Sequence, residues 1–545
     1  MWDGNLTNVG VREYQAWAIV NPYWPNPNPF VAGGGGGYRF YNALEPSPLV
    51  GTEREGDFFC AGQRWLSNGR LFVAGGTRKY PIDLPLGSPA VFEGSKLVYQ
   101  WDETPNASAG YPFGRWFRML DLAVERWYPT VTTDGTTAER TLVLGGTDWP
   151  GTGWVIMPEV NNYEAYRNPF GAFPPVATAE QKLTGSDPRL YLGPPLPLLA
   201  PFTGTVPGFN NYPRIHALGV LDPIGGGGFA PRLFVSGYWS MGFFWAHDPN
   251  VNPAYGYNIG VAGLTAFIDD GTSLLYPAAI GAVPSLVLRI GGAWRTTFPG
   301  PVVPSRRVES SVVTGSATTS ASWSSGGPTD LPNMERERFL ANIVMLPTRE
   351  LFAIGGYDAN GDANLHPEIF RVTAGWKYAA NHDSPRNYHS TAVLLPDGRV
   401  FVAGGEDRTS DYQLYEPEYL NVLPSHRPQG VSLLNEGTWG PISQTQLSGV
   451  GYGQAYVATL SSPLPVGIAV EEAVLMAPSA VTHHDDGGQR CIPLLVQDSI
   501  DPPIGYNSVR VNMPASQQHA PPGWYMLFLL SSAGVPSNAF WINLR

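Results

Sequence analysis

The sequence has few charged residues, an excess of acidic over basic ones, and no long apolar run. Charged residues make up 14% of the 545 residues, and 33 Lys plus Arg against 45 Asp plus Glu leave a formal net charge of −12. A negative surface disfavours binding to nucleic acid and to anionic membranes. No run of about 18 apolar residues is present, so we expect no membrane span. The first residues lack the basic and apolar regions of a signal peptide, so we expect a leader to be absent or already removed.

Cysteine is almost absent as well. Cys60 and Cys491 are the two cysteines of the chain. A disulfide between them is one interpretation, because secreted proteins often carry disulfides. Two buried free thiols are equally ordinary. The sequence also contains no Walker loop, no G-x-G-x-x-G before a helix, no H-E-x-x-H and no C-x-x-C, so it gives no sign of the nucleotide or zinc chemistry that these motifs support.

Glycine, proline and aromatic residues are abundant instead, with 64 Gly, 53 Pro and 12% aromatic residues, which predicts many short strands joined by turns. One pattern recurs: a strand opening, a turn, and an apolar strand that ends in glycine. Each copy predicts a β-hairpin, and the Gly-Gly ending resembles a kelch repeat of about 50 residues. The clear copies are 58–76, 126–146, 335–356 and 387–405; a weaker copy runs from 211 to 238, and 305–316 is a further candidate opening.

Hairpins of this kind bury their faces by stacking radially, so we expect an all-β protein with a β-propeller. Five or six copies are visible, and we expect a seven-bladed kelch-type propeller over residues 1–425. After Pro428 the pattern changes to short apolar strands at the spacing of a β-sandwich. We therefore expect an Ig-like β-sandwich over residues 426–545.

Equivalent positions of different blades lie at similar height around a propeller axis. Cys60 stands nine residues before the turn glycine Gly69 (69 − 60), and His389 stands nine before Gly398 (398 − 389). The repeat around Tyr128 is shorter, so its match is approximate. These openings would bring Cys, Tyr and His side chains together at one end of the axis, which is a set suited to metal binding and redox chemistry.

Five motifs in chain order carry a more specific resemblance. They are Phe59-Cys60-Ala61-Gly62, Arg126-Trp127-Tyr128, the segment Arg386 to Arg399, Thr482-His483 followed by Gln489-Arg490, and the ending formed by Pro522 to Phe528 and Ser532 to Ser537. With these motifs the chain resembles the galactose oxidase / glyoxal oxidase family of copper-radical oxidases. The similarity runs from about residue 57 to residue 545.

The resemblance implies one copper ion and a protein-derived cofactor. It implies that Cys60 forms a thioether with the ring of Tyr128, and that this linked phenol is an equatorial copper ligand and holds a radical. It implies that Tyr388 is the axial ligand and the proton acceptor, and that His389 and His483 are equatorial ligands. Imidazole and phenolate suit Cu(II). One copper supplies one electron, so a two-electron oxidation needs the radical as a second carrier.

Two pairs of adjacent residues raise a geometric question, because neighbours on a strand point to opposite faces. His483 and His484 compete for one ligand position, and the spacing to Gln489 favours His483. Tyr388 and His389 are both required at the metal, so the chain must bend between them, and the sequence does not reveal how.

The resemblance also implies a tryptophan stacked on the thioether. Trp149 is the candidate and Trp154 a weaker one, although both have an ordinary interpretation as loop anchors. Arg306 or Arg307 stands where some family members place a substrate-contacting arginine, and a surface or salt-bridged arginine is an equally good interpretation.

The resemblance implies oxidation of a small primary alcohol or aldehyde, or of a carbohydrate, with O2 reduced to H2O2. Three interpretations stay open beside this one: an aldehyde oxidase of the glyoxal oxidase type, a kelch-type binding or structural propeller without turnover, and a carbohydrate-anchored wall protein in which oxidation modifies a polysaccharide. We expect a monomer with no nucleic-acid partner. Peroxide production suits an extracellular, cell-surface or periplasmic location.

Overall fold

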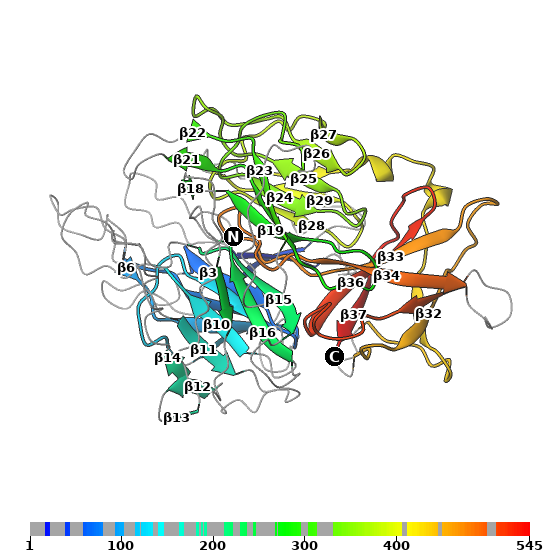
Figure 1. Ribbon diagram of the computed structural model, residues 1–545, viewed down its shortest axis with the longest axis horizontal. Helices are drawn as coiled ribbons and strands as arrows, with labels where there is room; N and C mark the ends of the chain where they lie inside the picture. Colours follow the sequence, from blue (N-terminus) through cyan, green and yellow to red (C-terminus); the bar gives the residue numbers. More distant parts are fainter. Residues whose placement is uncertain are drawn as a thin grey trace.

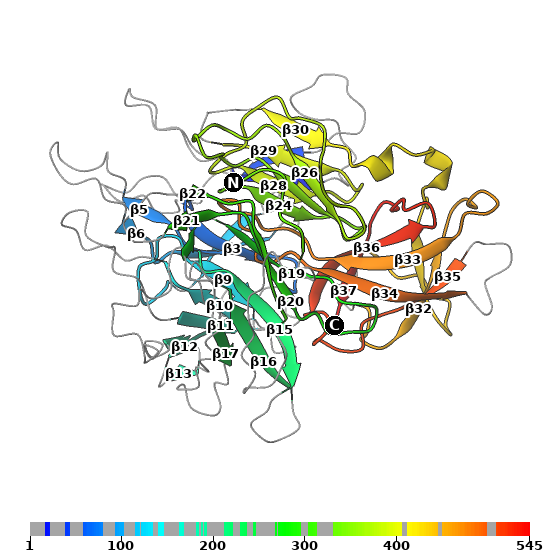
Figure 2. The same cartoon turned by 45° about the horizontal axis from the view of Figure 1, so that its top comes forward.

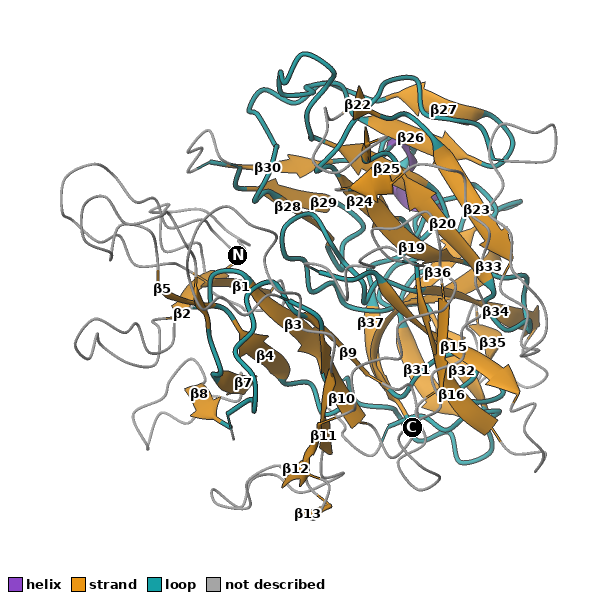
Figure 3. Cartoon of the chain, turned by 60° about the vertical axis from the view of Figure 1, so that its left-hand side comes forward, coloured by secondary structure: helices purple, strands orange, loops and turns teal. Residues whose placement is uncertain are grey.

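The protein is built from β-strands and turns in every part of the chain that the computed structural model describes (Figure 3). The two helical segments among the described residues are the 3-10 helices η3 (Glu418–Leu420) and η4 (Pro424–His426). None of the described helical segments has the length and apolar character that crossing a membrane requires. The described residues are 17–21, 39–43, 58–79, 93–102, 115–119, 121–133, 140–146, 163–167, 181–184, 187–188, 190–192, 212–221, 229–236, 243–246, 267–269, 271–295, 303–312, 331–405, 411–444, 449–498 and 508–545.

Six sheets follow one another along the chain as propeller blades (Figure 1). Their first strands contact one another from blade to blade, β3 with β9, β9 with β15 and β24 with β28, so the first strand of each blade lies on the inside. The blades are β3 (Ala61–Trp65), β4 (Leu71–Gly75), β7 (Val98–Asp102) and β8 (Arg115–Arg118); β9 (Thr130–Thr133), β10 (Arg140–Leu144), β11 (Tyr163–Arg167), β12 (Gln181–Thr184), β13 (Asp187–Pro188) and β14 (Leu190–Leu192); β15 (Ile215–Leu221), β16 (Phe229–Val235) and β17 (Phe243–Ala246); β19 (Thr272–Tyr276), β20 (Leu286–Ile290) and β23 (Val308–Val312); β24 (Asn342–Met345), β25 (Leu351–Ile354), β26 (Glu368–Arg371) and β27 (Gly375–Tyr378); and β28 (Thr391–Leu394), β29 (Val400–Ala403) and β30 (Tyr412–Tyr415).

Three smaller sheets accompany these blades. They are β1 (Trp17–Asn21) with β2 (Arg39–Ala43), β5 (Thr77–Lys79) with β6 (Glu93–Gly94), and β18 (Phe267–Asp269) with β21 (Ala293–Arg295) and β22 (Val303–Pro304). The described residues thus contain six blades of three or more strands, and the number seven remains a prediction.

The expected hairpins are found at all four clear repeats and at the weaker copy, as β3–β4, β9–β10, β24–β25, β28–β29 and β15–β16. The expectation of a blade opening at 305–316 is wrong. That segment forms β23, which pairs with β20 as the third strand of the fourth blade. The opening hairpin of this blade is β19–β20, which the repeat pattern missed because its turn contains neither Asp-Gly nor Asn-Gly.

The Gly-Gly endings allow the next segment of chain to pack against the blade. Gly355 has a φ of 73°, and a Cβ there would lie 1.7 Å from the carbonyl oxygen of Arg386. Gly75 has a φ of 77°, and its Cβ would lie 2.6 Å from the carbonyl oxygen of Arg126. The close approach leaves no room for a Cβ at either position, and the positive φ also favours glycine. The repeated glycines therefore leave room for the backbone of Arg126 and Arg386, the buried arginines that precede the second and sixth blades.

The C-terminal part is a sandwich of seven strands with its own apolar core, which includes Leu475, Val511 and Leu527. Strand β34 joins the two layers, because its first half pairs with β33 and its second half with β35. The all-β fold class with a C-terminal sandwich is thereby confirmed. The strands are β31 (Ser432–Asn435), β32 (Ala455–Thr459), β33 (Val470–Met476), β34 (Cys491–Asp498), β35 (Ser508–Asn512), β36 (Gly523–Ser531) and β37 (Phe540–Leu544).

The change of architecture falls between β30, which ends at Tyr415, and β31, which begins at Ser432. A division into domains 1–425 and 426–545 remains our proposal. The segment 477–490 between β33 and β34 leaves the sandwich and reaches into the middle of the propeller sheets, where it is seen in orange in both views (Figure 1 and Figure 2). This inserted loop is the feature that connects the two domains at the site described next.

Candidate metal centre

Three of the predicted site residues occupy the same backbone position in three blades. Cys60 and Tyr128 lie just before the first strands of the first and second blades, and His389 lies just before that of the sixth. Their φ angles are 65°, 62° and 67°, in the left-handed region that side chains rarely adopt. Tyr212 and Leu340, with φ of 47° and 56°, hold the same position in the third and fifth blades. The blade repeat therefore creates a ring of turns that point side chains toward the axis.

Backbone hydrogen bonds fix these turns to one another. The amide of Tyr128 donates to the carbonyl of Cys60 at 2.9 Å, and the amide of Tyr212 donates to the carbonyl of Tyr128 at 2.7 Å. The spacing between successive blades at the axis is thus set by the main chain. Strained backbone of this kind persists where surrounding structure holds it, and it clusters at functional sites.

The left-handed turn also answers how Tyr388 and His389 reach one place. With His389 at φ 67°, strand alternation is broken, and the two rings lie with centroids 3.8 Å apart. The hydroxyl oxygens of Tyr388 and Tyr128 are 2.5 Å apart. The ring of His389 is 4.5 Å from that of His483, nearly perpendicular at 82°. Two phenols and two imidazoles therefore converge.

His483 comes from the inserted loop, in a tight turn where the amide of Asp485 donates to the carbonyl of Thr482 at 2.8 Å. His483 and His484 both have positive φ, 48° and 59°, and they point to different partners. Nε2 of His483 lies 3.7 Å from Sγ of Cys60, whereas Nε2 of His484 lies 3.2 Å from a guanidinium nitrogen of Arg214. This separation supports His483 as the ligand.

Hydrogen bonds to three different blades hold the inserted loop. Gln63 of the first blade donates to the carbonyl of Val481 at 2.5 Å. Arg490 of the loop donates to the carbonyl of Ala217 in the third blade. Gln489 of the loop contacts the backbone of the fifth blade: it accepts from the amide of Met345 at 2.9 Å and donates to the carbonyl of Ile343 at 2.8 Å.

An ion pair adds a further connection between the loop and the third blade. Arg214 pairs with Asp485 at 3.1 Å, and both side chains are almost fully buried. Burial raises the pKa of Asp485 to about 6, and the charge of Arg214 opposes that shift. Breaking such a pair by removing one partner leaves a buried charge, which is strongly destabilising.

Burial controls the protonation of the metal-facing groups. Burial, with a smaller contribution from His389, holds the pKa of His483 well below its usual value, so the imidazole is neutral and presents a lone pair. Burial also raises the pKa of Tyr128 well above 10, and the neighbouring Cys60 and Tyr388 add to this. The phenol therefore stays protonated unless a cation compensates for its ionisation.

This donor set fits a copper ion. It offers imidazole nitrogen and phenol oxygen, which suit the tetragonal geometry of Cu(II). Within the described ranges no group of three or more His, Cys, Asp or Glu side chains is placed to hold a metal, so the two tyrosines are essential to the set. Cys60 and Cys491 are both buried and free, so the disulfide considered from the sequence does not form.

Cys60 and Tyr128 belong to one apolar cluster, and the ring of Tyr128 has two parallel neighbours there. Trp127 stacks on it at 3.9 Å and 12°, and Tyr212 at 4.8 Å and 25°. Trp149 and Trp154, the tryptophans predicted to stack, lie outside the described residues. Sequence reasoning missed Trp127 and Tyr212; a Tyr-Pro dipeptide occurs at 128–129 and at 212–213, but also elsewhere in the chain, so it is a weak signal for Tyr212.

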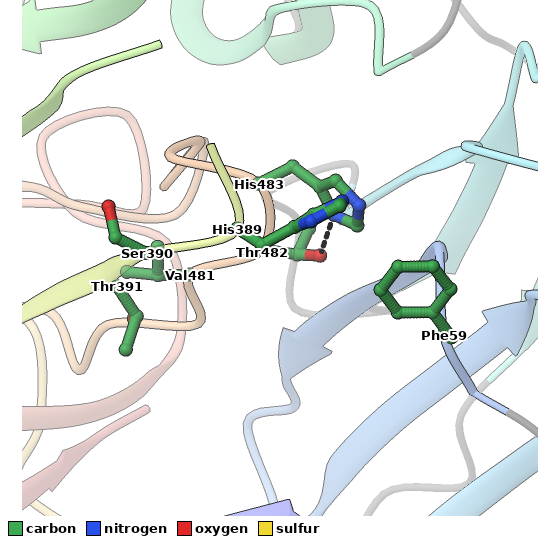
Figure 4. Close-up of a pocket in the computed structure, with 7 residues that line it drawn as sticks. All are labelled: Phe59, His389, Ser390, Thr391, Val481, Thr482 and His483. Atoms are coloured by element: carbon green, nitrogen blue, oxygen red, sulfur yellow. Dashed lines mark hydrogen bonds between the residues drawn. The ribbon is translucent and has the colours of Figure 1, made fainter. Parts of the chain in front are cut away.

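A pocket lies beside the two histidines, and Figure 4 shows the ring of Phe59 directed toward them. The ring centroids of Phe59 and His389 are 5.0 Å apart. Arg306 and Arg307 are exposed and do not line this pocket. The lining residues are Phe59, His389, Ser390, Thr391, Val481, Thr482 and His483.

Comparisons with known proteins agree with this geometry. Residues 441–544 match the family described as galactose oxidase-like, early set domain. An aldehyde oxidase GLOX of Vitis pseudoreticulata is 28% identical over 237 residues, 39% of this chain and 43% of that protein. A galactose oxidase of Gibberella zeae is 32% identical over 213 residues, 37% of this chain and 28% of that protein. The resemblance to the galactose oxidase / glyoxal oxidase family is confirmed.

A solved structure extends this similarity to the fold. A novel fungal alcohol oxidase in complex with copper matches with a TM-score of 0.61 and 21% identity over 90% of this chain and 86% of that chain. The match supports the all-β architecture over both the propeller and the sandwich. The matched segments span less than half the length of the galactose oxidase and aldehyde oxidase relatives.

Proposed function

We propose that the chain is a copper-radical oxidase that couples the two-electron oxidation of a small primary alcohol or aldehyde to the reduction of O2 to H2O2. The convergence of the donor set carries the proposal. Tyr128 and Tyr388 approach within 2.5 Å through their hydroxyl oxygens, beside two histidines and a buried thiol. The similarity to an aldehyde oxidase, a galactose oxidase and a copper-bound alcohol oxidase supports the same chemistry.

In this proposal Tyr128, Tyr388, His389 and His483 hold one copper ion. When bound, the copper supplies a one-electron acceptor and a Lewis acid. With the cation bound, Tyr388 would be ionised, and its phenolate oxygen would accept the proton of the substrate hydroxyl. Tyr128, linked to the sulfur of Cys60, carries the second electron equivalent.

The thioether forms when a bond joins Sγ of Cys60 to a ring carbon of Tyr128. This loses two hydrogen atoms, which O2 takes up as two electrons and two protons. Both side chains lie in one buried apolar cluster, which shields an oxidised ring from water. Trp127, stacked on Tyr128, contributes to that shielding.

The substrate class is proposed more broadly, as a small alcohol, aldehyde or carbohydrate. The pocket is lined by the aromatic ring of Phe59 and the two histidines, with Ser390, Thr391 and Thr482 beside them. Such a lining suits a small polar molecule with an apolar face. Because the reaction releases peroxide, we propose an extracellular, cell-surface or periplasmic location. We also propose a monomer.

The decisive experiment is a peptide mass map after copper loading in air. We expect the peptides that contain Cys60 and Tyr128 to be joined, with the loss of two hydrogen atoms. The variant Cys60→Ser serves as the control and must give separate peptides. Separate peptides in the unmodified protein, despite bound copper, would overturn the radical mechanism.

Peroxide release then distinguishes the alternatives. A panel that contains primary alcohols, sugars and aldehydes side by side decides between an alcohol oxidase and an aldehyde oxidase of the glyoxal oxidase type. A protein that binds no copper and forms no thioether would favour the binding or structural propeller. Glycan binding without peroxide would favour pure anchoring to a carbohydrate.

A further inference from the structure

Tyr212 stands in the third blade where Cys60 and Tyr128 stand in the first and second. It shares their left-handed backbone, with φ 47°, and its amide donates to the carbonyl of Tyr128 at 2.7 Å. The side chain is 4% exposed and belongs to the same apolar cluster as Cys60 and Tyr128. The ligand set proposed above gives this third tyrosine no role.

The contacts of Tyr212 join three parts of the site. Its hydroxyl lies 3.1 Å from Nδ1 of His483 and 3.2 Å from the carbonyl oxygen of Ala61, the residue after Cys60. Its ring stacks on Tyr128 at 4.8 Å and lies 5.0 Å from the ring of His483. The blade thus holds the inserted loop through a hydroxyl and holds the phenol of Tyr128 through a ring face.

The direction of these hydrogen bonds follows from their chemistry. Nε2 of His483 faces Sγ of Cys60, on the side where the metal ligands converge. A neutral imidazole that binds a metal through Nε2 carries its proton on Nδ1, and an acceptor for that proton fixes the tautomer and the ring plane. The carbonyl of Ala61 can only accept, so the hydroxyl of Tyr212 donates to Ala61 and accepts from Nδ1–H.

Thr482 offers a second partner, because its Oγ1 lies 2.9 Å from Nδ1 of His483. It belongs to the same turn as His483 and moves with the loop. Tyr212 belongs to a blade, so its hydroxyl can fix the position of His483 relative to Tyr128 and Cys60. The two partners therefore differ in what they can position.

We propose that Tyr212 is a positioning residue of the copper centre, which orients His483 through Nδ1 and supports the ring of Tyr128. The proposal rests on the function proposed above. The third blade would thus contribute to metal binding although it supplies no metal ligand itself.

The test is the variant Tyr212→Phe, which removes the hydroxyl and keeps the ring. Copper affinity is measured by competition with a chelator, and the Cu(II) form is examined by electron paramagnetic resonance. We expect copper binding to weaken by about 10- to 100-fold, the usual cost of losing a group that orients a metal-binding histidine. We also expect a changed copper hyperfine splitting, which a loss of stability alone would not produce.

Tyr525→Phe is the matched control. Tyr525 is also a buried tyrosine, and its hydroxyl donates to one backbone carbonyl, that of Pro521, at 2.7 Å in the sandwich core. We expect this variant to lose stability and to keep the copper affinity and spectrum of the unmodified protein. Thr482→Val shows separately what the partner within the loop contributes.

The outcomes separate the two proposals. If the unmodified protein binds no copper, the proposed function and this inference both fall. If it binds copper and forms the cross-link, but Tyr212→Phe has the same affinity and spectrum as Tyr525→Phe, the inference alone is overturned. A change in Tyr212→Phe that exceeds the change in Tyr525→Phe supports it.

Discussion

The propeller and the sandwich deliver side chains to the same site in different ways. The blade turns that carry Cys60 and Tyr128 are joined by a main-chain hydrogen bond of 2.9 Å, which any sequence with this backbone can make. The loop that carries His483 is held by side chains such as Gln63 and Gln489. Main-chain hydrogen bonds between blades therefore position the repeated part of the site, and individual side chains position the inserted part.

From this difference we expect the two parts to tolerate substitutions unequally. The fifth blade has Leu340 in the left-handed turn where other blades have Cys60, Tyr128 or His389. The same turn thus forms with a cysteine, a tyrosine, a leucine or a histidine at this position. The inserted loop has no such repeat behind it, so its position depends on each of its anchors.

The largest effect is expected from removing a ligand of either part. His389→Ala and His483→Ala should each weaken copper binding by more than about 100-fold, beyond the range of groups that only orient a ligand. His484→Ala, which affects the partner of Arg214, should retain most of the copper affinity. Chelator competition measures all three, and strong copper binding by His483→Ala would show that His484 is the ligand.

A loss of one loop anchor should have the next largest effect. Gln489→Ala leaves the amide of Met345 and the carbonyl of Ile343 without this buried partner, at a cost of about 1–3 kcal/mol for each group. We expect the copper affinity to fall by roughly 10-fold as His483 loses its place.

Asn543→Ala provides the matched control for this anchor. Asn543 is buried in the sandwich and donates to the carbonyl of Ser67 in the propeller at 2.9 Å, outside the inserted loop. It should destabilise the protein without changing the copper affinity. Equal affinities in Gln489→Ala and Asn543→Ala would contradict a special role of the loop anchors.

Acid should destabilise the folded protein through His216, a buried histidine of the third blade. Burial, then the charges of Arg490 and Arg214, lowers the pKa of His216 from 6.5 to about 3. The unfolded chain therefore binds a proton at His216 between these pH values and the folded protein does not. Stability falls as pH drops through this window, by about 1.4 kcal/mol per pH unit for this group.

Chemical unfolding at several pH values measures how the free energy of unfolding depends on pH. This slope reports the difference in bound protons between the unfolded and the folded state, and His216→Asn should reduce that difference by up to one proton. His216 hydrogen-bonds to Ser273 at 2.8 Å, so the variant also shifts the stability at every pH. The slope is the informative quantity. An unchanged slope would show that other buried histidines, such as His382, dominate the acid response.

The smallest effect concerns strain outside the site. Trp439 lies in a turn of the sandwich with φ 54° and is 38% exposed. Trp439→Gly relieves about 1 kcal/mol of strain from the left-handed backbone. Part of this gain is lost, because glycine gives the unfolded chain more conformational entropy. The ring of Trp439 is only partly exposed, so the apolar contacts that it loses should offset this relief of strain. We expect the free energy of unfolding at fixed copper concentration to change by less than about 1 kcal/mol. A larger loss would mean that the covered part of the ring contributes more to stability than the strained backbone costs.

The sequence predicted the repeated part of the site better than the inserted part, for a physical reason. Cys60 and His389 stand at the same distance from their turn glycines, and the structure gives them the same backbone conformation. The position of His483 was implied by the family resemblance and by nothing local, because no periodic pattern covers the loop. The apolar periodicity likewise could not show that 305–316 ends a blade, since a third strand has the same alternation as a first one.

The left-handed turns were also beyond sequence reasoning. Glycine or asparagine usually marks such positions, and here Cys, Tyr, Leu and His occupy them. Tyr388 and His389 could therefore be named as a pair, but their common direction could not be derived. Tyr212 went unassigned because its repeat is the weakest, and the Tyr-Pro dipeptide that it shares with the second blade also occurs elsewhere in the chain.

The inserted loop has a consequence for the integrity of the molecule. Tyr128 and His389 lie in propeller blades and His483 in the loop inserted between two sandwich strands, so an ion held by all three would link these two parts of the chain. By mass action, a metal at 100 times its dissociation constant adds about 2.7 kcal/mol to the joined state over the separated one. Removal of copper would then loosen the inserted loop first, because the buried apolar cluster that Met476 and Phe528 share with Met345 and Phe352 would still hold the two parts together.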